Sequence, residues 1–349
     1  MGESPIHQKT IYYAPSFVDR IMAAIERLPG PYWAAYLVFF ILEVGALQVV
    51  AWLTEFNQLF VFEPVLLIFP FWLCFGLAVM TYLNGFAGQM VSHFCTLLNG
   101  DDETEARLRY EFTVMPARPV VINSLFWVVI YFILWLFNYE AVKQIWSFES
   151  PYLIAAVFVV GLASFTIGSA IYYQAIRQLF LVHRTLAKVE SINIFQLDPV
   201  YAFSRLTARI GISWLILLSV TVLLLSRLTG PLVFVIYGLQ GILALCAFVL
   251  PLWSIHTRLV AEKRELQDAS NLRMQETLQL LSAYLDEKNL APMDEINKAL
   301  ASLVLERETL SKIPTWPWRT ETLRGFASAL LLPVLLLLIQ LGLQLWLGN

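Results

Sequence analysis

Charged side chains are scarce in this chain of 349 residues, of which only 14% are Asp, Glu, Lys or Arg. A soluble globular domain carries about 25% charged residues. Together with a 58% share of apolar residues, this scarcity excludes a soluble enzyme and a disordered chain. The net charge of −3 is also too small, and too mixed in sign, to indicate a nucleic-acid partner.

Cysteines and catalytic motifs are equally scarce. Cys74, Cys95 and Cys246 are the only cysteines, and they lie within or next to apolar runs. They are typical of small buried hydrophobes, which excludes a disulfide scaffold. The sequence has no phosphate-binding glycine loop, no dinucleotide-binding glycine motif, no serine-hydrolase elbow and no zinc-peptidase helix motif. We therefore expect no enzyme, no bound cofactor and no metal site.

What the chain does have is long uncharged apolar runs, and its mean hydropathy is +0.67. A helix of about 20 apolar residues crosses the roughly 30 Å of hydrocarbon in a bilayer. Seven runs have this length, at 33–53, 64–83, 119–138, 152–173, 210–226, 231–253 and 325–347. The sequence therefore predicts an all-α integral membrane protein with seven transmembrane helices, whose first partner is the lipid bilayer.

The distribution of cations predicts the orientation of these helices. If the N-terminus is cytoplasmic, 21 of the 23 Lys and Arg residues fall on the cytoplasmic side, and only Lys143 and Arg227 fall outside. Cytoplasmic loops of membrane proteins carry such an excess of Lys and Arg. We therefore expect a multi-pass protein of the cell membrane (plasma or inner), with the N-terminus inside and the C-terminus outside.

Four regions follow from this topology. Residues 1–32 are expected to form a cytoplasmic amphipathic segment, and residues 33–253 a six-helix transmembrane bundle with cytoplasmic helical loops. Residues 254–324 are expected to form a cytoplasmic helical hairpin and an interfacial elbow, followed by the seventh transmembrane helix at 325–349. The hairpin carries a leucine stripe along one predicted face, formed by Leu259, Leu266, Leu272, Leu278, Leu281 and Leu285.

Glu43 is the one charged residue well inside a predicted span. A carboxylate at that depth costs several kcal/mol, roughly 2.5–3.5 on insertion scales, so it must be neutral, face the bundle interior or bind a partner. Gln48 in the same helix and Gln240 in the sixth are its expected polar neighbours. Two interpretations stay open: a protonated carboxyl group bonded to another helix, or a site for a cation or polar substrate.

The end of the chain contains two further candidates. Pro333 is expected to kink the last span, and Gln340 and Gln344 lie one helical turn apart on it, which favours either a pore-lining stripe or a packed interface. The segment before this span contains Pro314, Trp316, Pro317 and Trp318. Its two prolines exclude a continuous helix, so we expect an elbow at the membrane surface or a hinge that transmits motion.

Two functions are compatible with these features. The first is an oligomeric channel or small transporter that uses Glu43 and the kinked last span. The second is a membrane scaffold or signalling subunit that transports nothing and docks a cytoplasmic protein on residues 254–312. A homo-oligomer is compatible with both.

Overall fold

The chain folds into helices, as shown by a computed structural model that describes residues 13–54, 61–98, 100–146, 150–189, 193–224, 231–286 and 293–347. Within these ranges, seven helices are long and apolar enough to cross a membrane. This confirms the all-helical class and the seven predicted spans, and it indicates a multi-pass membrane protein. The orientation of the spans stays a prediction.

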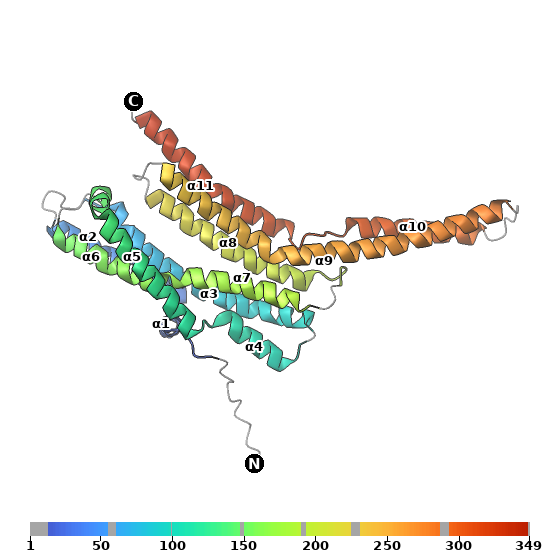
Figure 1. Cartoon of the computed structure of the whole chain (residues 1–349), viewed down its shortest axis with the longest axis horizontal. Helices are drawn as coiled ribbons and strands as arrows, with labels where there is room; N and C mark the ends of the chain where they lie inside the picture. Colours follow the sequence, from blue (N-terminus) through green and yellow to red (C-terminus); the bar gives the residue numbers. More distant parts are fainter. Residues whose placement is uncertain are drawn as a thin grey trace, which may run out of the picture.

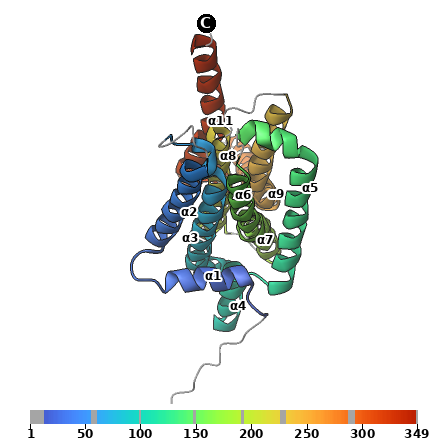
Figure 2. The ribbon, with the colours of Figure 1, turned by 90° about the vertical axis from the view of Figure 1, so that its left-hand side faces the viewer.

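The first helix, α1 (Phe17–Glu26), lies across the ends of the spans rather than along them (Figure 2). A capping box starts it: the Asp19 amide donates to Ser16 Oγ at 3.1 Å, and the Ser16 amide donates to Asp19 Oδ2 at 3.0 Å. Val18 and Met22, four residues apart on one face, are buried in the main core. The apolar face of α1 is therefore covered by the protein itself.

The first two spans are α2 (Tyr32–Thr54) and α3 (Ile68–Leu97), and a short 3-10 turn at Pro64–Leu67 leads into α3. Helix α4 (Asp102–Thr113) turns back under the end of α3. Phe94 of α3 stacks on Phe203 with ring centroids 3.9 Å apart and also contacts Phe112 of α4 at 5.3 Å. All three rings are fully buried, so they form the centre of the core at this end of the bundle.

The third and fourth spans are α5 (Ala117–Trp146) and the continuous run of α6 (Pro151–Ala163), a π-helical turn at Ser164–Gly168 and α7 (Ala170–Ala187). The π-turn leaves backbone carbonyls outside the regular ladder. Ser124 of α5 donates to the carbonyl of Thr166 at 2.6 Å, and Asn123 donates to that of Ser169 at 3.2 Å. These polar side chains therefore supply hydrogen bonds to backbone carbonyls that the irregular turn leaves without a helical donor inside the bundle.

The last three spans are α8 (Asp198–Leu224), α9 (Pro231–Asp286) and α11 (Thr320–Leu347), with α10 (Met293–Lys312) before the last. Helix α8 packs against α3, α9 and α11, and α3 and α8 are the most buried spans. Figure 1 shows the second half of α9 leaving the bundle with α10 beside it. We call residues 254–286 together with α10 the α9–α10 hairpin.

The leucine stripe predicted for one face of the hairpin is not a single face. Leu259 is buried, and Leu266 and Leu281 are half-buried, whereas Leu272, Leu278 and Leu285 are exposed. The reason lies in the spacing, because intervals of six residues rotate successive side chains away from a common helical face. The hairpin therefore buries part of its leucines and exposes the rest.

Candidate functional site

Glu43 lies half-buried on α2 and faces α3. Its Oε2 atom accepts a weak hydrogen bond from the Cys74 thiol at 3.9 Å. No Lys or Arg forms an ion pair with it among the described residues. A thiol is a poor donor, so this contact compensates only a small part of the desolvation of a carboxylate.

The structure does not bring Gln48 and Gln240 to Glu43. Gln48 is buried and bonds to the segment after α2: its Nε2 donates to the Val61 carbonyl at 2.8 Å, and its Oε1 accepts from the Glu63 amide at 3.3 Å. Gln240 is half-buried on α9, and none of the hydrogen bonds found in the described part of the chain joins it to Glu43. The expected three-residue polar site is therefore reduced to Glu43 and Cys74.

The last span is one helix that contains Pro333, and this proline is buried on the side of α11 that packs against the bundle. The side chains of Gln340 and Gln344 lie outside the described residues. The exposed side chains of the described stretch from 331 to 339 are all apolar, namely Leu331, Leu332, Val334, Leu335, Leu338 and Ile339. This stretch therefore presents a surface suited to lipid or to another helix, and Pro333 does not face outward.

The segment with Pro314, Trp316, Pro317 and Trp318 is irregular, as predicted from its prolines. Aromatic rings hold it in place. Trp316 stacks on His256 of α9 with centroids 3.7 Å apart and on Trp318 at 4.4 Å. The stack continues from Trp318 to Phe248 at 4.9 Å and from Phe248 to Phe326 of α11 at 4.1 Å.

Polar contacts add to this packing. Lys263 Nζ donates to the carbonyls of Ser311 and Ile313 at 2.8 and 2.7 Å, which satisfies the C-terminal end of α10. Arg319 forms an ion pair with Asp198 at the start of α8. Five stacked rings and these bonds favour the interpretation as a fixed elbow over that of a free hinge.

A groove of about 530 Å³ lies where the α9–α10 hairpin meets the segment before α8. We call it the hairpin-base groove. Phe195 from that segment and Leu305 from α10 line it and are 64% and 65% exposed, and Leu266 of α9 is a third apolar lining residue. Glu306 also lines it and forms an ion pair with Arg273 at 2.7 Å. Three separate elements thus place apolar groups around one concave surface, two of them exposed and Leu266 half-buried.

A more polar cavity of about 550 Å³ lies between α1, α3 and α4. Its charged lining residues are Asp19, Arg20, Glu26 and Arg109. Two cations and two anions do not select a ligand of one charge. Burial raises the pKa of Asp19 above its ordinary value, although Ser16 and Met115 donate hydrogen bonds to its carboxylate.

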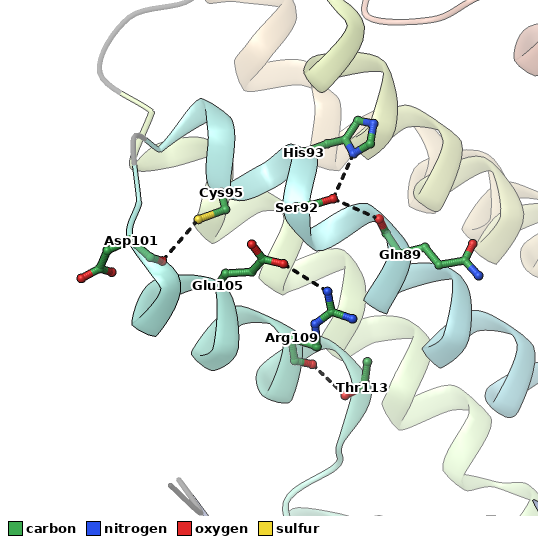
Figure 3. A network of polar contacts seen from close by, with 8 residues as sticks. All are labelled: Gln89, Ser92, His93, Cys95, Asp101, Glu105, Arg109 and Thr113. Atoms are coloured by element: carbon green, nitrogen blue, oxygen red, sulfur yellow. Dashed lines mark hydrogen bonds and ion pairs between the residues drawn. The ribbon is translucent and has the colours of Figure 1, made fainter. Parts of the chain in front are cut away.

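The other wall of this cavity belongs to a polar network at the end of α3 and along α4 (Figure 3). Arg109 pairs with Glu105 at 3.1 Å, and the Cys95 thiol donates to the Asp101 carbonyl at 3.7 Å. Asp101 caps α4, and the hydrogen bonds from Thr104 lower the pKa of Asp101. Of the contacts drawn in Figure 3, the bond from Cys95 to Asp101 joins α3 to the start of α4, and the others lie within one helix and support it.

Sequence reasoning missed the groups that fasten the N-terminal segment to the bundle. The Tyr13 hydroxyl donates to the Val114 carbonyl at 2.6 Å and accepts from Arg177 at 2.6 Å, and burial raises the pKa of Tyr13 to about 12. The spacing of Ser16 and Asp19 is a recognisable capping-box signal. Nothing local in the sequence points to Phe195, which is far from the hairpin along the chain.

In the part of the chain that the structure describes, no three His, Cys, Asp or Glu side chains gather as a metal site requires. Comparisons with protein families, with curated proteins and with solved structures gave no match. The function therefore has to be argued from the chain itself.

Proposed function

We propose that this protein is a membrane-anchored docking subunit whose α9–α10 hairpin binds a helix of a cytoplasmic partner protein. The observation that carries the proposal is the hairpin-base groove, with Phe195 and Leu305 exposed on either side of it. Exposed apolar side chains within the spans face lipid. The hairpin projects from the bundle, so its exposed apolar side chains face water, and such patches typically mark protein interaction sites.

The charges of the hairpin support a protein partner. Residues 254–312 contain eight Lys and Arg residues and ten Asp and Glu residues. This near balance favours neither nucleic acid nor an anionic membrane surface, because both select a strong excess of cations. The positive-inside distribution of cations supports a cytoplasmic position for the hairpin. An amphipathic helix inserts its apolar face into a groove of this kind.

Photocrosslinking in cells tests the proposal. A photoreactive residue at position 305 should yield a crosslinked product heavier than the chain, and Phe195→Ala should reduce its yield at least about tenfold, as expected for loss of a central aromatic anchor worth about 2 kcal/mol. The same residue at Leu272, which is exposed on the hairpin outside the groove, should yield little product. Absence of a product at 305, or a product that contains two copies of this chain, would contradict docking of a separate partner.

A proton or cation transporter is the second candidate, and Glu43 is the observation that favours it. The carboxyl group lies within a span, and the Cys74 thiol is its one hydrogen-bonding partner among the described residues. In liposomes with an imposed pH gradient, Glu43→Gln should abolish flux and Glu43→Asp should retain part of it. Equal flux in the wild type, in Glu43→Gln and in empty liposomes would exclude this candidate.

A further inference from the structure

A third groove lies between α7 and α9 and over α8, at the end of the spans nearest the hairpin, with a volume of about 500 Å³. We call it the α7–α9 groove. Small residues, Ala175, Gly211 and Ala247, line part of it, and the larger Phe180 and Leu250 line it from α7 and α9. Both large side chains are 63% exposed. The groove therefore exists because small side chains on three helices are flanked by large ones.

The groove is apolar almost throughout. Its lining residues are Ala175, Ile176, Leu179, Phe180, His183, Ile210, Gly211, Trp214, Leu243, Cys246, Ala247, Leu250 and Pro251. All of them belong to helices that are long and apolar enough to cross a membrane. Its α8 and α9 lining belongs to the predicted spans 210–226 and 231–253, whereas its α7 lining follows the predicted span 152–173. The groove therefore lies at the end of the predicted spans, where hydrocarbon would meet the headgroups, and its volume is that of a small-molecule site.

One end of the groove is cationic. His183 lines it there; Arg184 follows Phe180 by four residues, and Lys188, the residue after α7, follows Arg184 by four, so these cations continue the exposed side of α7 past the end of the groove. Both cations are exposed, and residues 170–189 contain no Asp or Glu. On α9, Arg258 reaches toward this end and donates to the Leu186 carbonyl at 3.3 Å. The charge at this end is thus complementary to a phosphate group.

Trp253 of α9 lies near the cationic end of the groove and indicates the level of the lipid headgroups there. Trp253 follows Leu250 by three residues and is exposed, next to the elbow ring Trp316 at 5.8 Å. Exposed tryptophans concentrate where hydrocarbon meets the headgroups. The apolar length of the groove and its cationic end therefore match the two parts of a phospholipid in the leaflet on the side of the hairpin.

We propose that the α7–α9 groove is a binding site for one anionic phospholipid, with an acyl chain along Phe180, Ala247 and Leu250 and the phosphate at His183, Arg184 and Lys188. The site needs no partner protein and is independent of the docking role of the hairpin. The α9 residues that line the groove, 243–251, come just before the part of α9 that leaves the bundle (Figure 1).

Native mass spectrometry of the full chain in detergent tests the acyl-chain part, with phosphatidylglycerol added as the probe. The wild type should retain one phosphatidylglycerol. Ala247→Phe fills the groove and should lower the retained fraction at least tenfold, and the milder Ala247→Leu should lower it less. Ala327→Phe makes the same change at an exposed position of α11 outside the groove and should change nothing. Full retention in Ala247→Phe would overturn the site.

A competition between phosphatidylglycerol and phosphatidylcholine with identical chains tests the headgroup part. A cation near a membrane surface contributes about a fivefold preference for an anionic lipid, so Arg184→Gln and Lys188→Gln together should reduce the preference by roughly 25-fold. Arg20→Gln removes an exposed cation of α1 and should leave it unchanged. An absence of preference in the wild type, or equal preference in the double variant, would overturn the assignment of the phosphate.

Discussion

Replacing Asp19 by alanine should release α1 and the segment before it from the bundle. The Oδ2 atom of Asp19 accepts three hydrogen bonds, from the Ser16 amide at 3.0 Å, the Ser16 hydroxyl at 2.7 Å and the Met115 amide at 3.0 Å. It therefore caps α1 and at the same time joins it to the α4–α5 connection. Two backbone bonds, between Ser16 and Met115 and between Ala14 and Ala117, lie beside it.

The size of the effect follows from what the substitution leaves behind. Met115 is completely buried, so its amide would lose its acceptor without gaining water, at a cost of about 1–3 kcal/mol. Loss of the capping box adds about 0.5–2 kcal/mol. Relief of the buried charge of Asp19 offsets part of this, so the net loss is about 2–4 kcal/mol. Opening of the α1 contact should therefore become roughly 30- to 700-fold more frequent.

Hydrogen exchange resolved by peptide measures this opening directly. Peptides that cover 13–20 and 114–118 should exchange faster in Asp19→Ala by the stated factor, while peptides from α8 should not change. Asp19→Asn keeps an oxygen acceptor for the Ser16 and Met115 amides and removes the buried charge, so exchange should stay within about tenfold of the wild type. Unchanged exchange in Asp19→Ala would refute the view that this carboxylate fastens α1.

The pH dependence of the same contact has a definite sign. Burial raises the pKa of Asp19 in the folded protein, so the folded state binds a proton more readily than the unfolded chain. The contribution of this group to stability is then largest below its ordinary pKa of about 3.9 and is lost as the pH rises through the folded value. Exchange corrected for the intrinsic rate should therefore slow, not accelerate, when the pH is lowered from 7 to 4.

Three other perturbations have expected outcomes. Gly161→Ala should lower the free energy of unfolding by about 1–3 kcal/mol, measured by thermal unfolding, because the new Cβ would overlap the Tyr131 phenol. Gly45→Ala is the control, because its Cβ meets open space and the change should be neutral or slightly stabilising. Trp316→Ala removes the ring between two stacked neighbours and should expose residues 311–319 to limited proteolysis; equal cleavage rates would contradict a packed elbow. Acidification should fray the first turn of α4, because hydrogen bonds from Thr104 lower the pKa of Asp101 and their contribution to stability is lost as the pH falls through the lowered pKa. Hydrogen exchange in this turn should therefore become faster at low pH, and Asp101→Asn should remove that pH dependence.

Several features of the fold were predictable because they depend on local composition. A run of about 20 uncharged apolar residues is long enough to cross the bilayer as a helix, whatever its neighbours are. The irregular segment around Pro314 and Pro317 was predictable for a similar reason, since proline removes a helical donor wherever it stands. The π-turn at Ser164–Gly168 was not predictable, because its stability comes from side chains of α5 about 40 residues away in the chain.

The candidate site at Glu43 was also predictable from the sequence only in part. Glu43 was recognisable from the sequence because a charge inside an apolar run is costly in any fold. The partner of Glu43 was not recognisable, because Gln48, five residues further along the same helix, bonds to the Val61 carbonyl, while Cys74 approaches Glu43 from α3. Which helices pack together decides such partners, and apolar runs of similar composition do not encode their order in space.

The scarcity of charge by itself determined that the described part of this chain has seven helices able to cross a membrane, because hydrocarbon excludes charged side chains locally and residue by residue. Only the tertiary structure decided which surfaces are left open. Leu305 and Leu310 are both apolar residues of α10, but Leu310 is buried and Leu305 is exposed beside Phe195. The physical reason is that a concave surface forms where separate elements meet, and their meeting depends on the packing of the whole bundle.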